Sequence, residues 1–203
     1  MIEGETTTTI QEEDVLRFGR MLFAVSSRPI LEQHVTGLVV PANRTGAMGV
    51  GIAGAVRAAG GFDIEREAMA HAPLAPGMAI ATGSGSLADR GIRAIIHAVI
   101  TDALGTPVER PDVIRDATGV ALQVAETLRI RSLAMPSLGG SMGSIGLDGT
   151  RAFTLMIDEA VAYQRRFSSR IERIVFVCRD NREARAVRSL LREVHSEWAG
   201  LGR

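Results

Sequence analysis

Two glycine-rich segments follow apolar, strand-like runs, and both have the composition of phosphate-binding loops. The first run, residues 37–42, ends at Asn43 and leads into the glycines of residues 44–55. The second run, residues 132–136, leads into the glycines of residues 137–146. Glycine lets backbone N–H groups approach a ligand closely, and a helix that begins after such a loop adds partial positive charge. Two such loops at neighbouring strand ends predict a diphosphate held between backbone donors.

The first loop also contains the spacing G-x-G-x-x-G, at Gly49–Gly54. A dinucleotide-binding fold would place the first glycine directly at the strand end and an acidic residue about 20 residues further on, and neither feature is present. A Walker loop needs a lysine, and all 23 basic residues of this chain are arginines. A nicotinamide-dependent oxidoreductase is therefore a weak alternative, and a change in reduced-cofactor fluorescence on mixing would reveal it.

The elements that must position these loops alternate along the chain. Alternation of apolar strands with helices predicts a largely parallel sheet covered by helices on both faces, with ligands at the carboxyl ends of the strands. The predicted strands are Met21–Ser26, Gly37–Val40, Met78–Thr82, Ile92–Val99, Ser132–Met135 and Ile171–Cys178. The predicted helices are residues 52–59, 63–71, 111–129, 148–166 and 181–197.

Composition narrows the class of protein. The chain has 203 residues, of which 46% are hydrophobic, which is enough for one domain of ordinary size. Its 23 basic and 23 acidic residues cancel in charge, so no strong nucleic-acid binding is expected.

The start of the sequence lacks the pattern of a signal peptide, and no apolar run is long enough to span a bilayer. These two features predict a cytoplasmic protein without a membrane partner. Residues 1–12 read as a flexible tail, and residues 13–203 as one domain.

In order and composition, these motifs resemble the macro domain family. The resemblance runs from about Met21 to Asp180 and is carried by the runs at 37–43, 51–61, 90–99, 130–136, 139–143 and 174–180. It implies a three-layer α/β/α fold around a mostly parallel, mixed sheet of about six strands. It also implies an ADP-ribose pocket, with no cofactor. His34 and His71 have no partners at metal-ligand spacing, so no metal site is expected.

The resemblance assigns ligand contacts residue by residue. Asn43 matches the family asparagine that faces the distal ribose, and it is the single candidate catalytic residue, as a group that orients water or ribose. The two glycine loops would enclose the diphosphate. The remaining ligand-binding candidates are Gly49, Gly51, Ile52, Ala53, Gly139, Gly140, Ser141, Met142 and Gly143.

Three departures from the family pattern fall on ligand-contacting positions. The aspartate that usually accepts a hydrogen bond from the adenine amino group is replaced at Arg28 or Pro29, so Glu32 or Asp180 would have to substitute, or a different base is bound. Met142 stands where a Phe or Tyr often faces the ribose. Residues 51–53 lack the aspartate of the strongest mono-ADP-ribose hydrolases.

The sequence therefore predicts a protein that binds ADP-ribose or a related nucleotide diphosphate, free or attached to a protein, with at most weak hydrolysis of ADP-ribose derivatives. Whether it is an enzyme is left open, because no residue is a convincing general base. His97 lies inside an apolar strand and is predicted to be a buried, neutral imidazole. Cys178 is predicted to be a small buried strand residue. The alternative is a non-catalytic reader or partner-binding module with altered nucleotide specificity.

Overall fold

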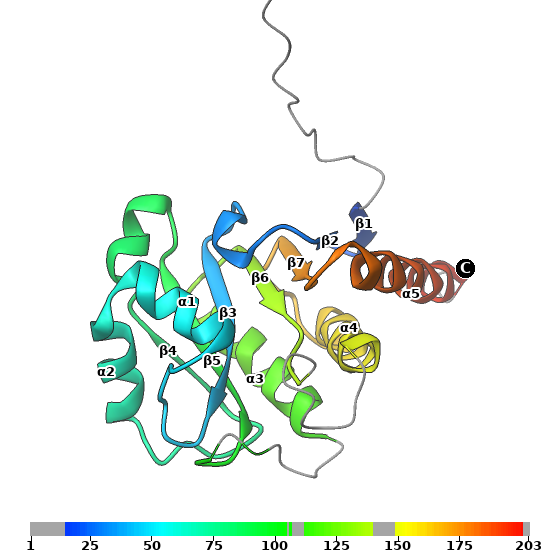
Figure 1. Cartoon of the computed structure of the whole chain (residues 1–203). Coiled ribbons are helices and arrows are strands. Elements are labelled where there is room, and N and C mark those ends of the chain that lie inside the picture. The colour runs from blue at the N-terminus through cyan, green and yellow to red at the C-terminus, as the bar shows by residue number, and fades with distance from the viewer. Residues whose placement is uncertain (1–14, 105, 107–111, 140–148, 201–203) are drawn as a thin grey trace, which may run out of the picture.

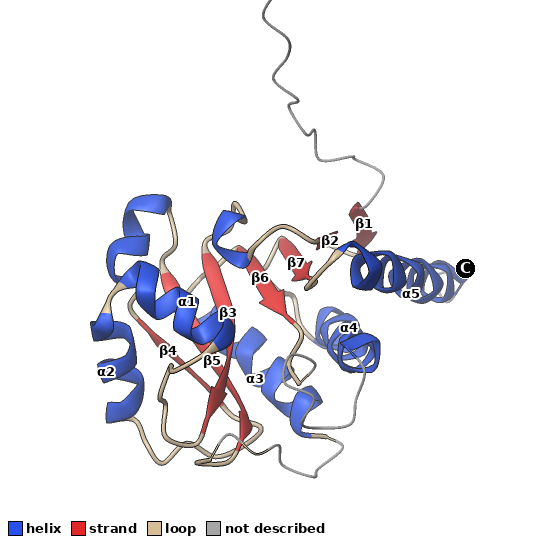
Figure 2. Ribbon diagram, viewed as in Figure 1, coloured by secondary structure: helices blue, strands red, loops and turns tan. Residues whose placement is uncertain are grey.

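The computed structural model describes residues 15–104, 106, 112–139 and 149–200, and Figures 1 and 2 show a sheet flanked by helices. The strands are β1 (Val15–Phe18), β2 (Met21–Ser26), β3 (Gly37–Asn43), β4 (Ala79–Thr82), β5 (Ala94–Thr101), β6 (Ser132–Pro136) and β7 (Arg173–Val177). The helices are α1 (Gly51–Gly60), α2 (Phe62–Ala70), α3 (Val113–Thr127), α4 (Gly149–Arg166) and α5 (Asn181–Gly200), with short 3-10 turns η2 (Ile30–Glu32) and η3 (Gly85–Arg90).

The seven described strands form one mixed sheet in the order β1-β2-β7-β6-β3-β5-β4. The five inner strands are parallel, and β1 and β4 close the two edges as antiparallel strands. The inner strands consist almost entirely of buried residues, as expected of strands covered on both faces. This order brings the carboxyl ends of β2, β7, β6 and β3 to one edge of the sheet.

Two hydrophobic layers hold the helices against the sheet. The larger layer joins the sheet to α3, α4 and α5, and it contains Phe18, Phe23, Phe153 and Phe176, whose side chains are fully buried. The smaller layer lies under α1 and the two 3-10 turns, and its members include Val56, Ile30 and Leu87. The arrangement is the expected three-layer α/β/α fold, in which α1 lies on the face opposite α3 (Figure 1).

In the middle of the sheet, β3 and β6 separate toward their carboxyl ends. The two strands pair only at Gly37 and Leu38 of β3. Pro41, which has no N–H to donate, lies beyond that point, where β3 pairs with β5 alone. The chain leaves β3 toward β4 and β5, whereas it leaves β6 toward β7, so the sheet has its topological switch point here. Ligands of open α/β sheets bind outside the carboxyl ends of strands at such a point.

The prediction of about six strands is one short. The additional strand is β1, whose four residues pair with β2 across a tight turn at Gly19, where φ is +58°. The four residues of β1 are too few, and too mixed in polarity, to predict a strand from the sequence. Pairing with β2 and the burial of Phe18 stabilise the strand. The predicted helices are confirmed to within three residues at each described end. No helix in the described ranges is long and apolar enough to cross a bilayer.

Candidate functional site

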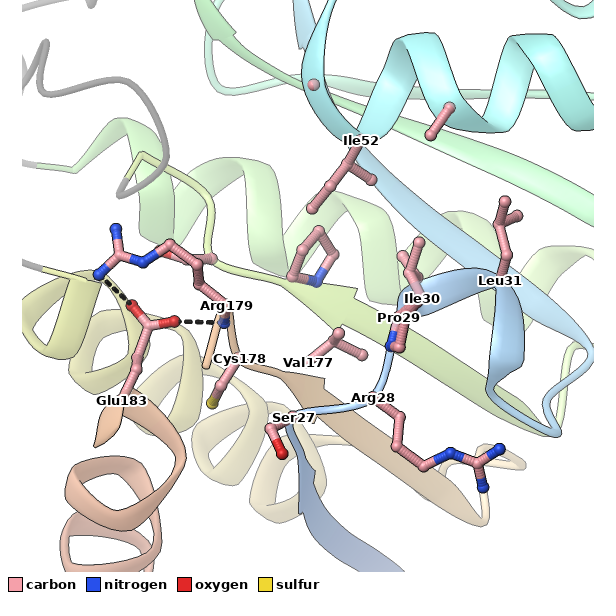
Figure 3. Close-up of a pocket in the computed structure, with 14 residues that line it drawn as sticks. Ser27, Arg28, Pro29, Ile30, Leu31, Ile52, Val177, Cys178, Arg179 and Glu183 are labelled. Carbon is pink, nitrogen blue, oxygen red and sulfur yellow. Dashed lines mark hydrogen bonds and ion pairs between the residues drawn. The ribbon is translucent and has the colours of Figure 1, made fainter. Parts of the chain in front are cut away.

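A pocket of about 430 Å³ opens at the carboxyl ends of β2, β6 and β7, beneath the start of α1 (Figure 3). This volume is in the range of small-molecule sites. The walls are mainly apolar, and the polar groups lie toward its ends. The lining residues are Ser27, Arg28, Pro29, Ile30, Leu31, Gly51, Ile52, Ala55, Pro136, Ser137, Val177, Cys178, Arg179 and Glu183.

The amino terminus of α1 faces this pocket without a cap. The residue before the helix, Val50, is extended and has no side chain that could accept a hydrogen bond, and the first turn contains no acidic residue. The first helical residues, Gly51 and Ile52, line the pocket. Backbone N–H groups of the first turn lack intrahelical partners, and their dipoles favour an anion. This end of the pocket is therefore suited to a phosphate or diphosphate.

Gly51 is the residue whose conformation permits this approach. Its φ is +62°, a region that residues with a side chain rarely adopt, and a Cβ added there would meet no atom within 4 Å. The open space in front of Gly51 belongs to the pocket. A glycine at this position keeps the helix terminus accessible.

Ser137 contributes a buried hydroxyl with no partner. The residue follows β6 directly, is 8% exposed and lines the pocket. Its Oγ forms no hydrogen bond within the part of the chain that the structure describes. A buried hydroxyl without a partner is costly, and a ligand atom in the pocket would satisfy it.

The polar groups near η2 do not supply an obvious acceptor for a base amino group. Arg28 binds Glu32 through its Nε and Nη2 atoms, each 3.2 Å from Glu32 Oε2. Glu32 is absent from the pocket lining, and Pro29 has no polar side chain. The Ser27 hydroxyl donates to Asn181 Oδ1 at 2.6 Å. The pocket therefore presents Arg28, a donor, where the sequence comparison placed the usual carboxylate.

On the other side, the β7–α5 junction is held by reciprocal capping. Asp180 Oδ1 accepts a hydrogen bond from the Glu183 N–H at 2.8 Å, and Glu183 Oε2 accepts one from the Arg179 N–H at 2.6 Å. The N–H groups of Glu183 and Arg182 hold the pKa of the Asp180 carboxyl below its usual value, and Arg179 adds to this effect. Asp180 and Glu183 therefore serve α5. Arg179, whose side chain is 67% exposed, stands at the pocket mouth.

Asn43 uses its side chain to shape the first loop. Its Oδ1 accepts hydrogen bonds from the N–H and hydroxyl of Thr45, at 3.0 and 2.7 Å, and its amide donates to the Ala47 carbonyl at 3.1 Å. Asn43 is not among the residues that line the pocket. Its predicted contact with ribose stays a prediction, and the second N–H of the amide has no described partner and could donate to a ligand.

The first loop is also tied to α2 by a carboxylate that the sequence did not single out. Glu65 accepts a hydrogen bond from the Met48 N–H at 2.6 Å and forms an ion pair with Arg57 of α1 at 2.9 Å. The Met48 N–H, aided by Arg57, keeps the pKa of the Glu65 carboxyl below its usual value although partial burial opposes this. Glu65 thereby fixes both the loop before α1 and the helix itself.

The comparison with protein families agrees with this geometry. The model of the macro domain family matches residues 39–156, which is more than half of the chain. The chain belongs to the macro domain family. The matched range contains α1 and β6, and residues of α1 and of the end of β6 line the pocket.

Two relatives of the macro domain illustrate how far the sequence similarity extends. An uncharacterised protein of Aeropyrum pernix is 36% identical over 129 residues, covering 64% of this chain and 66% of that protein. An uncharacterised protein of Mycobacterium tuberculosis is 35% identical over 136 residues, covering 67% of this chain and 35% of that protein. The matched segment thus spans about two thirds of the first relative and about one third of the second.

Solved structures of macrodomains share the fold at lower identity. The Oceanobacillus iheyensis macrodomain with ADP superposes with a TM-score of 0.76 at 17% identity, covering 90% of this chain and 96% of that one. The Trypanosoma brucei macrodomain in complex with ADP-ribose superposes with a TM-score of 0.71 at 22% identity, covering 82% and 68%. At these identities the likeness establishes the fold.

The structure brings some predicted ligand residues of the macro domain to the pocket and leaves others apart. Gly51 and Ile52 line it, whereas Gly49, Ala53 and Gly139 do not. A Cβ at Gly49 would meet open space, and Ala53 is buried against the core. Gly139 has a φ of +118°, which favours glycine there. The predicted contacts at Gly140, Ser141, Met142 and Gly143 lie outside the described residues.

Two residues considered for chemistry are part of the macro domain core. His97 is fully buried, its Nε2 lies 2.9 Å from the Thr82 hydroxyl, and burial lowers the pKa of its imidazole to about 4. The Cys178 thiol packs in the larger hydrophobic layer, and burial raises its pKa to about 12, so it is a poor nucleophile. No group of three potential metal ligands occurs among the residues that the structure places.

Three polar pocket residues that sequence reasoning missed share one signal. Ser27 and Ser137 come directly after β2 and β6, and Arg179 is the second residue after β7. The rule that ligands bind at the carboxyl ends of parallel strands would have selected these positions without any family pattern.

Proposed function

We propose that this macro domain binds ADP-ribose or a closely related nucleoside diphosphate in the pocket beneath α1. The observation that carries the proposal is the uncapped amino terminus of α1, which opens into a cavity of about 430 Å³. The complexes of the Trypanosoma brucei macrodomain with ADP-ribose and the Oceanobacillus iheyensis macrodomain with ADP support it.

The proposed ligand lies with its diphosphate against the first turn of α1. The backbone N–H groups at Gly51 and Ile52 and the Ser137 hydroxyl are the donors offered to it. The apolar side chains of Ile30, Leu31 and Val177 form walls suited to the flat face of a base or a sugar ring. The ligand therefore receives backbone and hydroxyl donors at its charged centre and apolar contacts beside it.

We propose that the protein retains this ligand rather than hydrolysing it rapidly. Among the described residues, Glu183 is the one carboxylate that lines the pocket, and it already accepts the Arg179 N–H. His97 is fully buried in the core and does not reach the pocket. A general base must reach the proton it removes, and no described side chain at this site is free to do so. A reader of ADP-ribose groups, free or attached to a protein, is the activity that the pocket favours.

Base selectivity is proposed to be weak. Glu32 is engaged by Arg28, and Asp180 by the start of α5, so neither carboxylate is available to the adenine amino group without giving up a partner. ADP-ribose should therefore exceed its guanine and hypoxanthine analogues in affinity by less than tenfold.

The first test is titration calorimetry of the purified protein with ADP-ribose, with AMP and NAD run alongside. We expect binding of ADP-ribose in the micromolar range and weaker binding of AMP, which lacks the second phosphate. Absence of heat with ADP-ribose, in a protein shown to be folded by its unfolding transition, would overturn the proposal.

Gly51→Val tests the location of the site. The substitution places branched bulk in the open space before α1 and should reduce affinity for ADP-ribose by at least tenfold. Gly91→Val is the matched control, because Gly91 also has a positive φ (+81°) and open space around it but does not line the pocket. Both variants carry similar backbone strain, so equal loss of binding in the two would contradict the assignment.

A further inference from the structure

A second hollow lies at the opposite end of the sheet. It has a volume of about 410 Å³ and is lined by Arg129, Arg131 and Arg170. Arg129 and Arg131 precede β6 and Arg170 precedes β7, whereas the pocket beneath α1 lies past the carboxyl ends of the same strands. At about 3.3 Å per residue, these five-residue strands separate the two hollows by roughly 16 Å.

The backbone that presents the three arginines is fixed. Arg129 is the second residue after α3. Its φ of +55° is the one positive φ among the non-glycine residues described, and its N–H donates to the Glu126 carbonyl at 3.0 Å. This position after a helix favours glycine, so an arginine is held there against its conformational preference. The Glu126 carboxylate accepts the Arg170 N–H, at 3.0 and 3.1 Å, and the Ser169 hydroxyl at 2.8 Å.

The positive charge in this hollow is only partly neutralised. Arg131 forms an ion pair with Glu172 at 2.7 Å. The guanidinium groups of Arg129 and Arg170 form no ion pair or hydrogen bond within the described ranges, since the Glu126 oxygens are directed to backbone and hydroxyl donors. Three guanidinium groups thus share one carboxylate partner around a single cavity. Such an arrangement repels itself and is stabilised by a bound anion.

The chemistry of the lining restricts the anion. Guanidinium groups form paired hydrogen bonds to the oxygens of phosphate, and three of them can engage more than one phosphate at a time. The lining described contains no aromatic side chain on which a base would stack. The ligand that fits is small and densely charged.

We propose that the hollow formed by Arg129, Arg131 and Arg170 binds consecutive phosphate groups, such as those of inorganic polyphosphate or of a nucleoside triphosphate. The site is distinct from the pocket beneath α1 and does not depend on the function proposed for that pocket. Its residues contact phosphate alone, so the rest of a nucleotide would project into solvent.

The experiment titrates the full chain with tripolyphosphate, with ATP, and with sulfate at matched ionic strength. Tripolyphosphate should bind at least tenfold more tightly than sulfate, and its affinity should fall as salt increases. With the pocket beneath α1 saturated by ADP-ribose, equal affinities for tripolyphosphate and ATP support a nucleoside triphosphate whose base projects into solvent. Tighter binding of tripolyphosphate than of ATP supports free polyphosphate as the source. Saturating ADP-ribose, which occupies the pocket beneath α1 if that proposal holds, should leave tripolyphosphate binding unchanged.

The double variant Arg129→Ala and Arg170→Ala should lose at least tenfold in affinity for tripolyphosphate. Both side chains are exposed and lack described partners, so the variant should unfold at the temperature of the parent protein. Arg66→Ala is the control, because Arg66 is an exposed arginine of α2, 2.9 Å from Asp63, away from this hollow. Three outcomes would overturn the proposal: no preference for tripolyphosphate over sulfate, equal losses in the double variant and the control, or tighter binding of single-stranded RNA than of tripolyphosphate.

Discussion

Two buried serines of the macro domain differ in whether their hydroxyl groups have partners. Ser84 is 5% exposed and donates to the Ile92 carbonyl at 2.6 Å. Ser137 is 8% exposed and has no partner within the described residues. A hydroxyl that satisfies a carbonyl contributes to stability, whereas one without a partner costs stability until a ligand meets it. The same side chain therefore has a structural role at one position and a proposed binding role at the other.

Ser137→Ala should weaken ADP-ribose binding by about tenfold, the typical loss for a hydrogen bond to a charged group. The stability of the unliganded protein should stay the same or rise, because the unpaired hydroxyl is removed. Ser84→Ala should lower the free energy of unfolding by about 1–3 kcal/mol and leave the affinity for ADP-ribose unchanged. Calorimetric titration and urea unfolding of both variants measure the two effects. Loss of stability in Ser137→Ala without loss of affinity would remove Ser137 from the site.

His97 gives the macro domain a predictable dependence on pH. Burial, and to a smaller extent the charge of His71, lowers the pKa of His97 to about 4 from 6.5 in an unfolded chain. Between these values the unfolded state binds the proton more readily, so the stability present above pH 6.5 falls as the pH drops toward 4. The full difference is about 3 kcal/mol for a group this well buried.

His97→Gln replaces the imidazole near Thr82 with an amide, which can hydrogen-bond but does not titrate. We expect the variant to be less stable than the parent protein at pH 7.5 and the difference between the two to shrink at pH 4.5. Comparing the two proteins at each pH cancels the contribution of the carboxylates, which both share. A constant difference across this range would show that His97 does not titrate within it.

At the scale of elements, the start of α1 depends on its neighbour α2. Glu65 of α2 binds the Met48 N–H in the preceding loop and Arg57 in α1, and so fixes the helix terminus that faces the pocket. Two residues later, Glu67 accepts the Gly83 N–H at 2.9 Å and fixes the turn after β4 instead. One helix therefore supports two loops, and only the first loop leads to the pocket.

Glu65→Ala should lower the free energy of unfolding by about 1–3 kcal/mol and weaken ADP-ribose binding several-fold, because both partners of the carboxylate lie beside the site. Glu67→Ala removes a carboxylate from the same helix and should leave the affinity unchanged. Thermal unfolding and titration of the pair separate the two roles. If both variants bind ADP-ribose as the parent protein does, the position of the first loop does not depend on Glu65.

At the scale of the whole molecule, the edge strand β1 packs against the last described helix, α5. Phe18 is fully buried, stacks on Phe23 with ring centroids 4.6 Å apart, and meets the ring of Trp198 in α5 edge-on at 5.7 Å. These contacts join the first described strand to the last helix. We propose that the domain includes β1, whereas the predicted tail, residues 1–12, lies outside the described residues.

Removal of residues 1–12 should leave the unfolding temperature within about one degree of that of the full chain. Removal of residues 1–18 deletes β1 and Phe18 and should cost at least the 3–5 kcal/mol typical of deleting a buried Phe, which is enough to lower the unfolding temperature by roughly 10 °C. Calorimetry of the two truncated chains measures the boundary. A large loss in the shorter truncation would place part of the first 12 residues within the fold.

Local sequence was sufficient for strands β2 to β7, for the helices and for the resemblance to the family. Continuous apolar runs such as Ile95–Ile100 cannot face water on either side, so they had to be inner strands of a parallel sheet, and glycines after two strands indicated where a diphosphate would approach. Gly51 and Ile52 were assigned from the family resemblance, and they line the pocket. The edge strand β1 was missed because pairing and the packing of Phe18, rather than its own pattern, keep it in place.

Tertiary structure decided the rest of the site, because its walls come from four segments far apart in the sequence: 27–31, 51–55, 136–137 and 177–183. They meet only through the order β2-β7-β6-β3, which no local pattern encodes. The same applies to individual side chains. The engagement of Asn43 with Thr45 and Ala47, the capture of Glu32 by Arg28 and the unpaired hydroxyl of Ser137 all depend on which atoms the fold brings within hydrogen-bond distance. The sequence by itself therefore determined which hydrogen-bond donors, acceptors and charges the protein has. Long-range packing determined which of these groups remained free to bind a ligand.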